Sequence, residues 1–262
     1  MERTSRIRTG RSVVAAGRSR PRLVIGDTLP VDTVDESVTI RSVMRARGLA
    51  SLIALLLAAS VTLDAGAVTG VVRTVARSGA APAAAVIYAE SIDAVSPRTA
   101  RRAVVRQKNK TFQPRVLVVP AGATVEFPND DNIFHNVFSL SPPQPFDLGL
   151  YRSGDTRSLT FTGPGVYRVF CNIHPQMNAF IVVAPSGFAT VASSDGRFTL
   201  DLPPGRYRLT ALSERAAPVS VEITSTDGAT TAPELTLNES SWVFTPHKNK
   251  FGQEYPAAAY RR

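Results

Sequence analysis

From residue 68 onward the sequence consists of short runs of alternating apolar and polar residues, separated by turns rich in Gly, Pro, Asn and Asp. In residues 197–202 every second residue is apolar, and Pro203-Pro204-Gly205 supplies the turn that follows. A period of two places alternate side chains on one face of a β-strand, whereas an amphipathic helix needs a stripe of period 3.6, which this region lacks. The sequence therefore predicts an all-β protein built from β-sandwiches.

The N-terminal region has the layout of an export signal. Gly48–Leu63 is an uncharged, apolar run, Arg45 and Arg47 precede it, and Ala65-Gly66-Ala67 follows it as a small-x-small cleavage site. The run is shorter than the ~20 residues of a typical spanning helix, so a Sec-type signal peptide is predicted, with an uncleaved membrane anchor as the alternative. We therefore expect a periplasmic or otherwise exported protein with no stable membrane anchor after cleavage.

An initiator normally stands close to its signal peptide, and Met44 would provide a compact charged start for a signal over 44–67. Residues 1–43 are then a mis-called start or a disordered extension. Residues 1–47 hold ten Arg against five acidic residues, which accounts for +5 of the net charge of +9. The remainder is only mildly basic and has no basic helix with interleaved aromatic residues, so no nucleic-acid partner is expected.

Metal-binding residue types are scarce and clustered. The chain has one Cys, three His and three Met, which excludes a disulfide framework, a Cys-rich zinc module and a multicopper enzyme. Cys171, His174 and Met177 fall within seven residues after a predicted strand, and His135 lies upstream. Two imidazoles, a thiolate and a weak axial thioether are the ligand set of a blue-copper electron-transfer site. The thiolate and imidazoles would also accept zinc, which stays an alternative.

Residues 103–184 resemble the cupredoxin (blue type 1 copper) family, amicyanin/plastocyanin-like. The resemblance is carried by Gly122-x-Thr124-Val125-x-Phe127, by His135-Asn136-Val137, and by Gly165-Val166-Tyr167 leading to Cys171. The C-x-x-H-x-x-M spacing with Pro175 after the His is similar to that of amicyanin, whereas plastocyanin has a longer His-to-Met gap. The resemblance implies a Greek-key β-sandwich with one type 1 copper per chain. It also implies the site residues His135, Cys171 and His174 as strong ligands, Met177 as the axial ligand and Asn136 as a supporting residue.

The same resemblance implies a carrier of single electrons rather than an enzyme. Its partner would be a redox protein, a dehydrogenase or a cytochrome, bound transiently, and amine (methylamine) utilisation is the pathway suggested. Phe134, Phe138 and Pro175 are expected to form an apolar docking rim around His174. A copper-binding carrier or sensor without electron transfer is the alternative.

A second module is predicted around the first. Residues 185–225 resemble the carboxypeptidase regulatory-like (transthyretin-like) β-sandwich, which is non-catalytic in its relatives. Residues 68–102 resemble the opening strands of such a module, so the copper domain is either inserted in it or in tandem with it. Residues 226–262 are expected to be a C-terminal tail that packs in part, with His247 an ordinary histidine.

Overall fold

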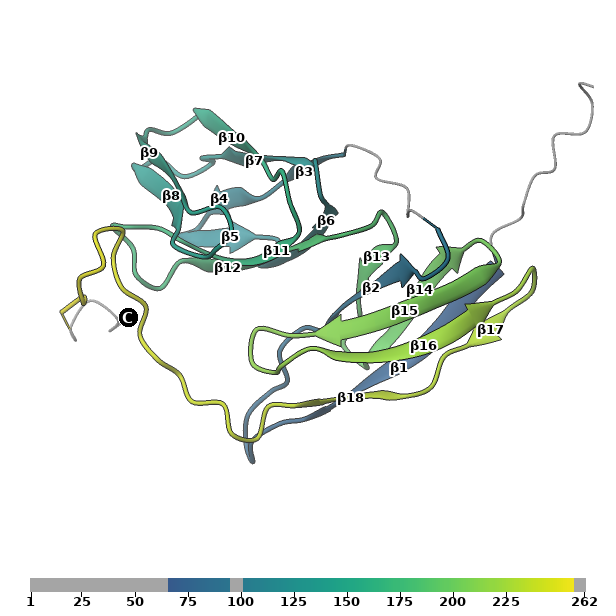
Figure 1. Cartoon of the computed structure of the whole chain (residues 1–262). Helices are drawn as coiled ribbons and strands as arrows, with labels where there is room; N and C mark the ends of the chain where they lie inside the picture. Colours follow the sequence, from purple (N-terminus) through teal and green to yellow (C-terminus); the bar gives the residue numbers. More distant parts are fainter. Residues whose placement is uncertain (1–65, 95–100, 257–262) are drawn as a thin grey trace, which may run out of the picture. The chain divides into compact units, whose positions relative to one another are not determined.

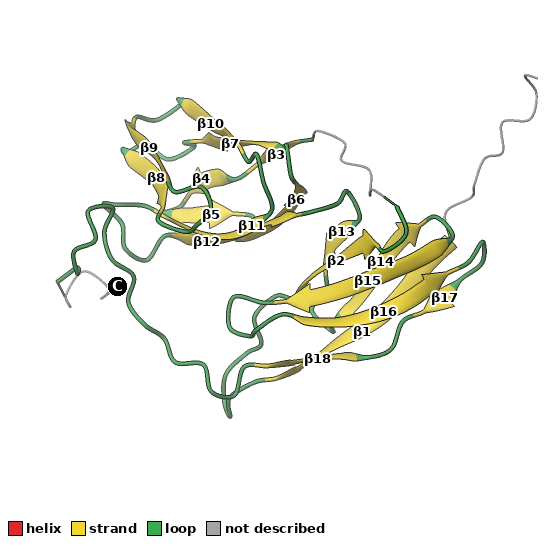
Figure 2. Cartoon of the chain, viewed as in Figure 1, coloured by secondary structure: helices red, strands yellow, loops and turns green. Residues whose placement is uncertain are grey.

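The computed structural model describes residues 66–94 and 101–256 (Figure 1). Every regular element in these ranges is a β-strand (Figure 2), which confirms the all-β prediction. The same ranges hold no helix long and apolar enough to cross a membrane. The predicted extension 1–43 and the signal peptide as far as residue 65 lie outside the described residues and stay predictions.

Residues 102–184 form one β-sandwich. Its two main sheets have the strand orders β10-β7-β3 and β6-β12-β11-β8-β9, and a hairpin, β4-β5, stands beside them. The strands are β3 (Arg102–Val104), β4 (Arg106–Lys108), β5 (Thr111–Gln113), β6 (Val116–Pro120), β7 (Thr124–Pro128), β8 (His135–Ser139), β9 (Phe146–Tyr151), β10 (Thr156–Thr160), β11 (Gly165–Phe170) and β12 (Asn178–Ala184).

Alternation along these strands builds the core of this sandwich and positions its loops. Val125 and Phe127 of β7 are fully buried against Val169 of β11 and Ile181 of β12 in one apolar cluster. Strands β11 and β12 pair as an antiparallel hairpin, and its loop spans residues 171–177. Strand β8 pairs with β11 on the other side. The start of β8 is thereby brought to the end of β11 and the loop that follows it.

The remaining strands form a second sandwich. One sheet has the order β14-β1-β17, with β18 also paired to β1, and the other has the order β13-β2-β15-β16. The strands are β1 (Gly66–Val75), β2 (Val86–Ser91), β13 (Ala189–Val191), β14 (Arg197–Leu202), β15 (Gly205–Leu212), β16 (Val219–Ser225), β17 (Thr230–Thr231) and β18 (Leu235–Asn238). Strands before and after residues 102–184 thus share the same two sheets, which is the pairing expected of an insertion. The resemblance to the carboxypeptidase regulatory-like module stays a prediction.

Two boundaries of the second sandwich differ from those expected. Strand β1 begins at Gly66, inside the predicted signal peptide 44–67, because Gly66 and Ala67 pair with Leu202 and Asp201. Strands β17 and β18 lie inside the predicted tail 226–262. Leu235 and Leu237 of β18 alternate with exposed residues and pack into the core, and both strands pair in parallel with β1. The segment without regular structure therefore starts after β18.

Candidate metal centre

Three elements bring the predicted ligands together. Cys171 follows the last residue of β11, His174 lies in the β11–β12 loop, and His135 is the first residue of β8. The Met177 amide donates to the His174 carbonyl at 2.9 Å, and the Cys171 amide donates to the Met177 carbonyl at 3.3 Å. These two bonds close the loop into a tight turn, which is the local reason that the C-x-x-H spacing turns both side chains to one side.

The three strong donor atoms form a small triangle. The Nδ1 atoms of His135 and His174 are 3.1 Å apart, and Cys171 Sγ lies 3.8 Å from the first and 3.7 Å from the second. His135 and Cys171 are fully buried, and His174 is half-buried. The structure thus brings together three of the four residues that the sequence analysis selected as ligands.

The size of this triangle fits a metal ion. The point equidistant from the three atoms lies about 2.1 Å from each, the circumradius set by their separations. Metal–imidazole bonds of the first-row ions measure about 2.0–2.1 Å, and metal–thiolate bonds about 2.3 Å. An ion would therefore fit between the three donors with only a small outward shift of the sulfur.

Protonation supports the same arrangement. His135 Nε2 contacts the Asp131 carboxylate at 2.8 Å, and a carboxylate only accepts, so Nε2 carries a proton and Nδ1 is the ring nitrogen that faces Cys171 and His174. Burial, together with nearby His135, lowers the pKa of His174 below its ordinary value of 6.5, which favours the neutral, metal-binding form of the His174 ring at pH 7. Burial raises the pKa of the Cys171 thiol, although the Asn136 amide opposes this. The thiol must therefore release its proton to bind a metal.

Met177 lies next to this group of donors in the fold. It is buried in the same apolar cluster as Cys171, and its carbonyl accepts the Cys171 amide. A thioether is a weak ligand, so its placement beside the thiolate is compatible with the axial position. Its role as the fourth ligand stays a prediction.

Asn136 connects the strand that carries His135 to the Cys171 loop. Its amide N–H donates to Cys171 Sγ at 3.4 Å, and its side-chain oxygen accepts from the Asn172 amide at 3.3 Å. Its Nδ2 group donates to Asp147 Oδ1 at 2.7 Å and to the Gly149 carbonyl at 2.9 Å. Asn136 therefore bridges the strand that carries His135 and the loop that carries Cys171.

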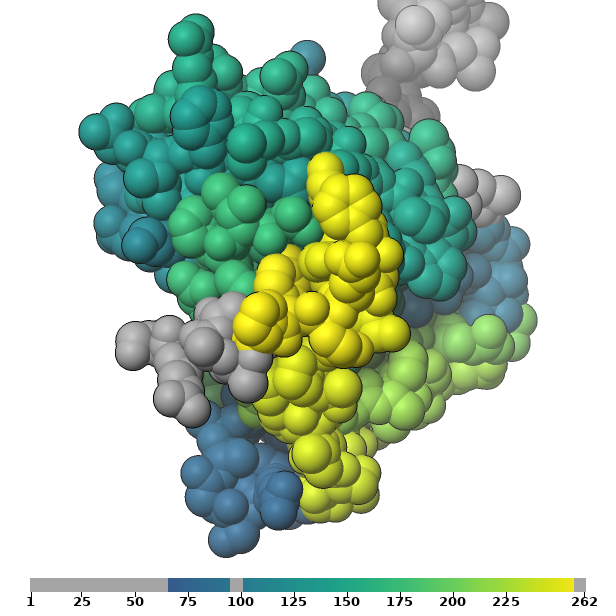
Figure 3. Space-filling view, turned by 90° about the vertical axis from the view of Figure 1, so that its left-hand side faces the viewer, coloured from purple at the N-terminus to yellow at the C-terminus, as the bar shows by residue number. Residues whose placement is uncertain are grey.

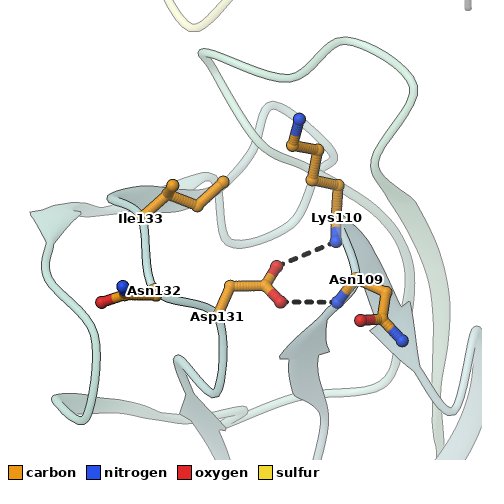
Figure 4. A pocket seen from close by; sticks show the side chains of 5 residues that line it. All are labelled: Asn109, Lys110, Asp131, Asn132 and Ile133. Atoms are coloured by element: carbon orange, nitrogen blue, oxygen red, sulfur yellow. Dashed lines mark hydrogen bonds between the residues drawn. The ribbon is translucent and has the colours of Figure 1, made fainter.

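Asp131 is a supporting residue that the sequence analysis missed. Besides His135, its carboxylate accepts the backbone amides of Asn109 and Lys110 at 2.6 and 2.8 Å (Figure 4). Burial alone would raise the pKa of Asp131, but the hydrogen bonds from Lys110, His135 and Asn109 hold it below its ordinary value. A charged carboxylate that orients the outer nitrogen of a histidine also strengthens the inner nitrogen as a donor. The available signal was an acidic residue four positions before His135.

The predicted docking rim is wrong in two of its three residues. Phe138 is fully buried, with its ring 6.0 Å from that of Phe170, and Pro175 is buried, with its carbonyl in contact with His247. Phe134 is exposed at 53%, as predicted. Ile173, which precedes His174, is also exposed, at 46%. The exposed apolar residues next to the two histidines are therefore Phe134 and Ile173.

Comparison with known proteins gives relatives for part of the chain. No protein-family model matches the chain. Amicyanin-alpha of Methylorubrum extorquens is 31% identical over 104 residues, which cover 38% of this chain and 87% of that protein.

Solved structures that align with the chain include two cupredoxins and a larger enzyme. Amicyanin of Paracoccus versutus is 25% identical, with 34% of this chain and 84% of that chain covered and a TM-score of 0.30. A purple cupredoxin of Nitrosopumilus maritimus is 26% identical, with 31% and 99% covered and a TM-score of 0.29. A copper-containing nitrite reductase of Thermus scotoductus is 33% identical, with a TM-score of 0.31, over 32% of this chain and only 22% of that one.

The relation to amicyanin-alpha is the one that assigns the family, because the match exceeds 30% identity and spans most of that protein. It accords with the sandwich of β3–β12 and with the His-Cys-His group at one end of that sandwich. The chain belongs to the cupredoxin family.

Proposed function

We propose that this protein is an exported carrier of single electrons that holds one copper ion at His135, Cys171 and His174, with Met177 as the axial ligand. The observation that carries the proposal is the triangle of two imidazole nitrogens and one cysteine sulfur, with sides of 3.1 to 3.8 Å. Soft thiolate and imidazole donors in this combination favour copper.

The protein's own residues would hold the ion and restrict its surroundings. When bound, copper supplies a one-electron couple between Cu(I) and Cu(II). His135 and Cys171 extend from paired strands, so their positions change little with oxidation state. The Asn136 amide, 3.4 Å from Cys171 Sγ, withdraws charge from the sulfur, and such hydrogen bonds tune reduction potential.

A partner would approach where the site reaches the surface. Cys171 and His135 are buried, whereas His174 is half-buried and follows exposed Ile173 in the chain. His174 also lies beside His135, which follows exposed Phe134. We propose this edge as the contact for a transient redox partner, a dehydrogenase or a cytochrome. Electron-transfer encounters bury little area, so two or three apolar residues are enough. A role in amine utilisation is the finer proposal, and the identity to amicyanin-alpha supports it.

The test is the visible and EPR spectrum of the protein loaded with Cu(II), beside Cys171→Ser. We expect an intense thiolate-to-copper charge-transfer band that disappears in Cys171→Ser, and reversible bleaching by one electron per copper. Tight binding of Cu(I) or Zn²⁺ with no such band would refute the electron carrier. That result would instead support a copper carrier or sensor, or a structural zinc site.

A further inference from the structure

The C-terminal segment 247–255 reaches the metal-binding loop although it lies more than seventy residues away in the chain. His247 Nε2 donates to the Pro175 carbonyl at 2.7 Å. The Lys250 amide donates to Asn172 Oδ1 at 3.0 Å, and the Tyr255 hydroxyl donates to the Asn172 carbonyl at 3.0 Å. In Figure 3 this segment, in yellow, lies on the surface beside green and teal residues of the first sandwich.

Ring packing fixes the same segment against the strand that leads into the loop. The His247 ring stacks on Phe170, with centroids 3.8 Å apart and planes inclined by 17°. Tyr255 meets the His247 ring edge-on at 5.3 Å. Phe170 immediately precedes Cys171, so the segment contacts the loop at Asn172 and Pro175 and also the last residue before the thiolate.

A salt bridge joins the segment to the residues that support His135. Lys250 Nζ lies 2.7 Å from Asp147 Oδ2, and the other oxygen of that carboxylate accepts from Asn136 Nδ2. Asn136 in turn accepts the Asn172 amide and donates its own amide to Cys171 Sγ. One hydrogen-bond network thus links the β8 strand, through Asn136, to the Cys171 loop, through Asn172. The C-terminal segment bonds to this network at Asp147 and at Asn172.

We propose that residues 247–255 act as a clamp that holds the 172–176 loop in the geometry that brings His174 to Cys171. His247, Lys250 and Tyr255 are positioning residues in this scheme and touch no ligand atom themselves. The loop's own backbone bonds within the described residues are the two that close its turn, whereas the clamp adds three hydrogen bonds and a ring stack. The effect of this clamp on a bound copper ion rests on the proposed function.

The first test uses the full chain without metal. The double variant His247→Phe with Tyr255→Phe keeps both rings and removes two donors to the loop. We expect amide hydrogen exchange at Asn172 and Met177 to become about two- to tenfold faster for each bond lost. Exchange at Val169, in the strand core, should stay unchanged and thereby show that the variant is folded.

The matched control is Lys248→Met, because Lys248 lies in the same segment but makes its ion pair with Glu254. It should leave loop exchange at the wild-type rate. The second readout is the EPR spectrum of the copper-loaded proteins, which should shift in the double variant and not in the control. Unchanged loop exchange, or an unchanged copper spectrum in the double variant, would overturn the clamp.

The two proposals fail separately. Faster amide exchange of the loop in the double variant, in a protein that binds no copper, would refute the proposed electron carrier and still support the clamp. A blue-copper spectrum with loop exchange unaffected would support the carrier and overturn the clamp.

Discussion

Replacement of Asn136 by Ala tests whether this side chain ties the His135 strand to the Cys171 loop. The residue is 2% exposed, and the change removes hydrogen bonds to Asp147, the Gly149 carbonyl and the Asn172 amide. A net hydrogen bond contributes about 0.5–1.5 kcal/mol, and one to a charged group about 1.5–3 kcal/mol. Two neutral bonds and one bond to a charged carboxylate sum to about 2.5–6 kcal/mol. Because all three partners are themselves partly exposed and can turn to water, we expect the lower part of this range, a loss of about 2.5–3.5 kcal/mol.

The assay is urea unfolding of the metal-free protein, followed together with hydrogen exchange of the Val169 and Ile181 amides. These two residues lie in the core of the first sandwich, so their exchange reports the stability of that sandwich and not of the second. The backbone N–H of residue 136 remains in the variant, so its bond to Cys171 Sγ should survive.

Asn238→Ala is the control for Asn136→Ala. The Asn238 side chain is exposed and bonds only to Ser240, so its loss should cost below about 1 kcal/mol. A loss of stability in Asn136→Ala no larger than in this control would show that the bridge between strand and loop contributes nothing, and the reasoning would be wrong.

Three further perturbations have defined outcomes. Asp131→Asn should weaken copper binding about 10- to 100-fold in a chelator competition, because the charge behind His135 is lost; equal affinity would contradict that role. Burial would raise the pKa of Asp147, but hydrogen bonds from Lys250 and Asn136 hold it below its ordinary value of 3.8. The ionised Asp147 side chain should therefore contribute its full stabilisation of the fold above pH 3.8, and this contribution should be lost as the pH falls further. Asp147→Asn should flatten this acid limb in a pH series of unfolding curves, and an unchanged slope would count against it. Gly196→Ala should lower the free energy of unfolding in urea by about 2–4 kcal/mol, because φ is +82° and a Cβ would lie 2.2 Å from a carbonyl oxygen of β1. The control Gly79→Ala should lower it by about 1 kcal/mol, because φ is similar, at +78°, but the added Cβ would meet nothing within 4 Å.

The ligand set is the part of the site that local sequence predicts well. Cys171 and His174 are three residues apart after a strand, and a tight turn of that length can bring both side chains to one side of the loop. His135 could be added because its residue type is scarce and its flanking residues match a known pattern. The strand faces follow from alternation in the same way, as in β14, where every second residue is buried.

The surroundings of the site depend on contacts that no local pattern encodes. Asp131 stands only four positions before His135, but the amides of Asn109 and Lys110 that hold its carboxylate come from a distant hairpin. Phe134 and Phe138 are both apolar neighbours of His135, yet one is exposed and the other is buried, because β8 is an inner strand of its sheet and Phe134 lies before its start.

Pairing between distant segments of the chain follows from the packing of the whole fold and not from any local pattern. The sequence predicts opening strands in residues 68–102 but only a tail in residues 226–262. The parallel pairing of β1 with β18 joins residues about 160 positions apart, and register between such distant strands is set by the packing of the whole sandwich. The contact of Tyr255 with Asn172, 83 residues away, is of the same kind. The sequence around a hydroxyl or a carbonyl group does not indicate which distant group it will bond. Local spacing therefore determined which atoms could bind a metal, and the tertiary fold determined which side chains hold those atoms in place.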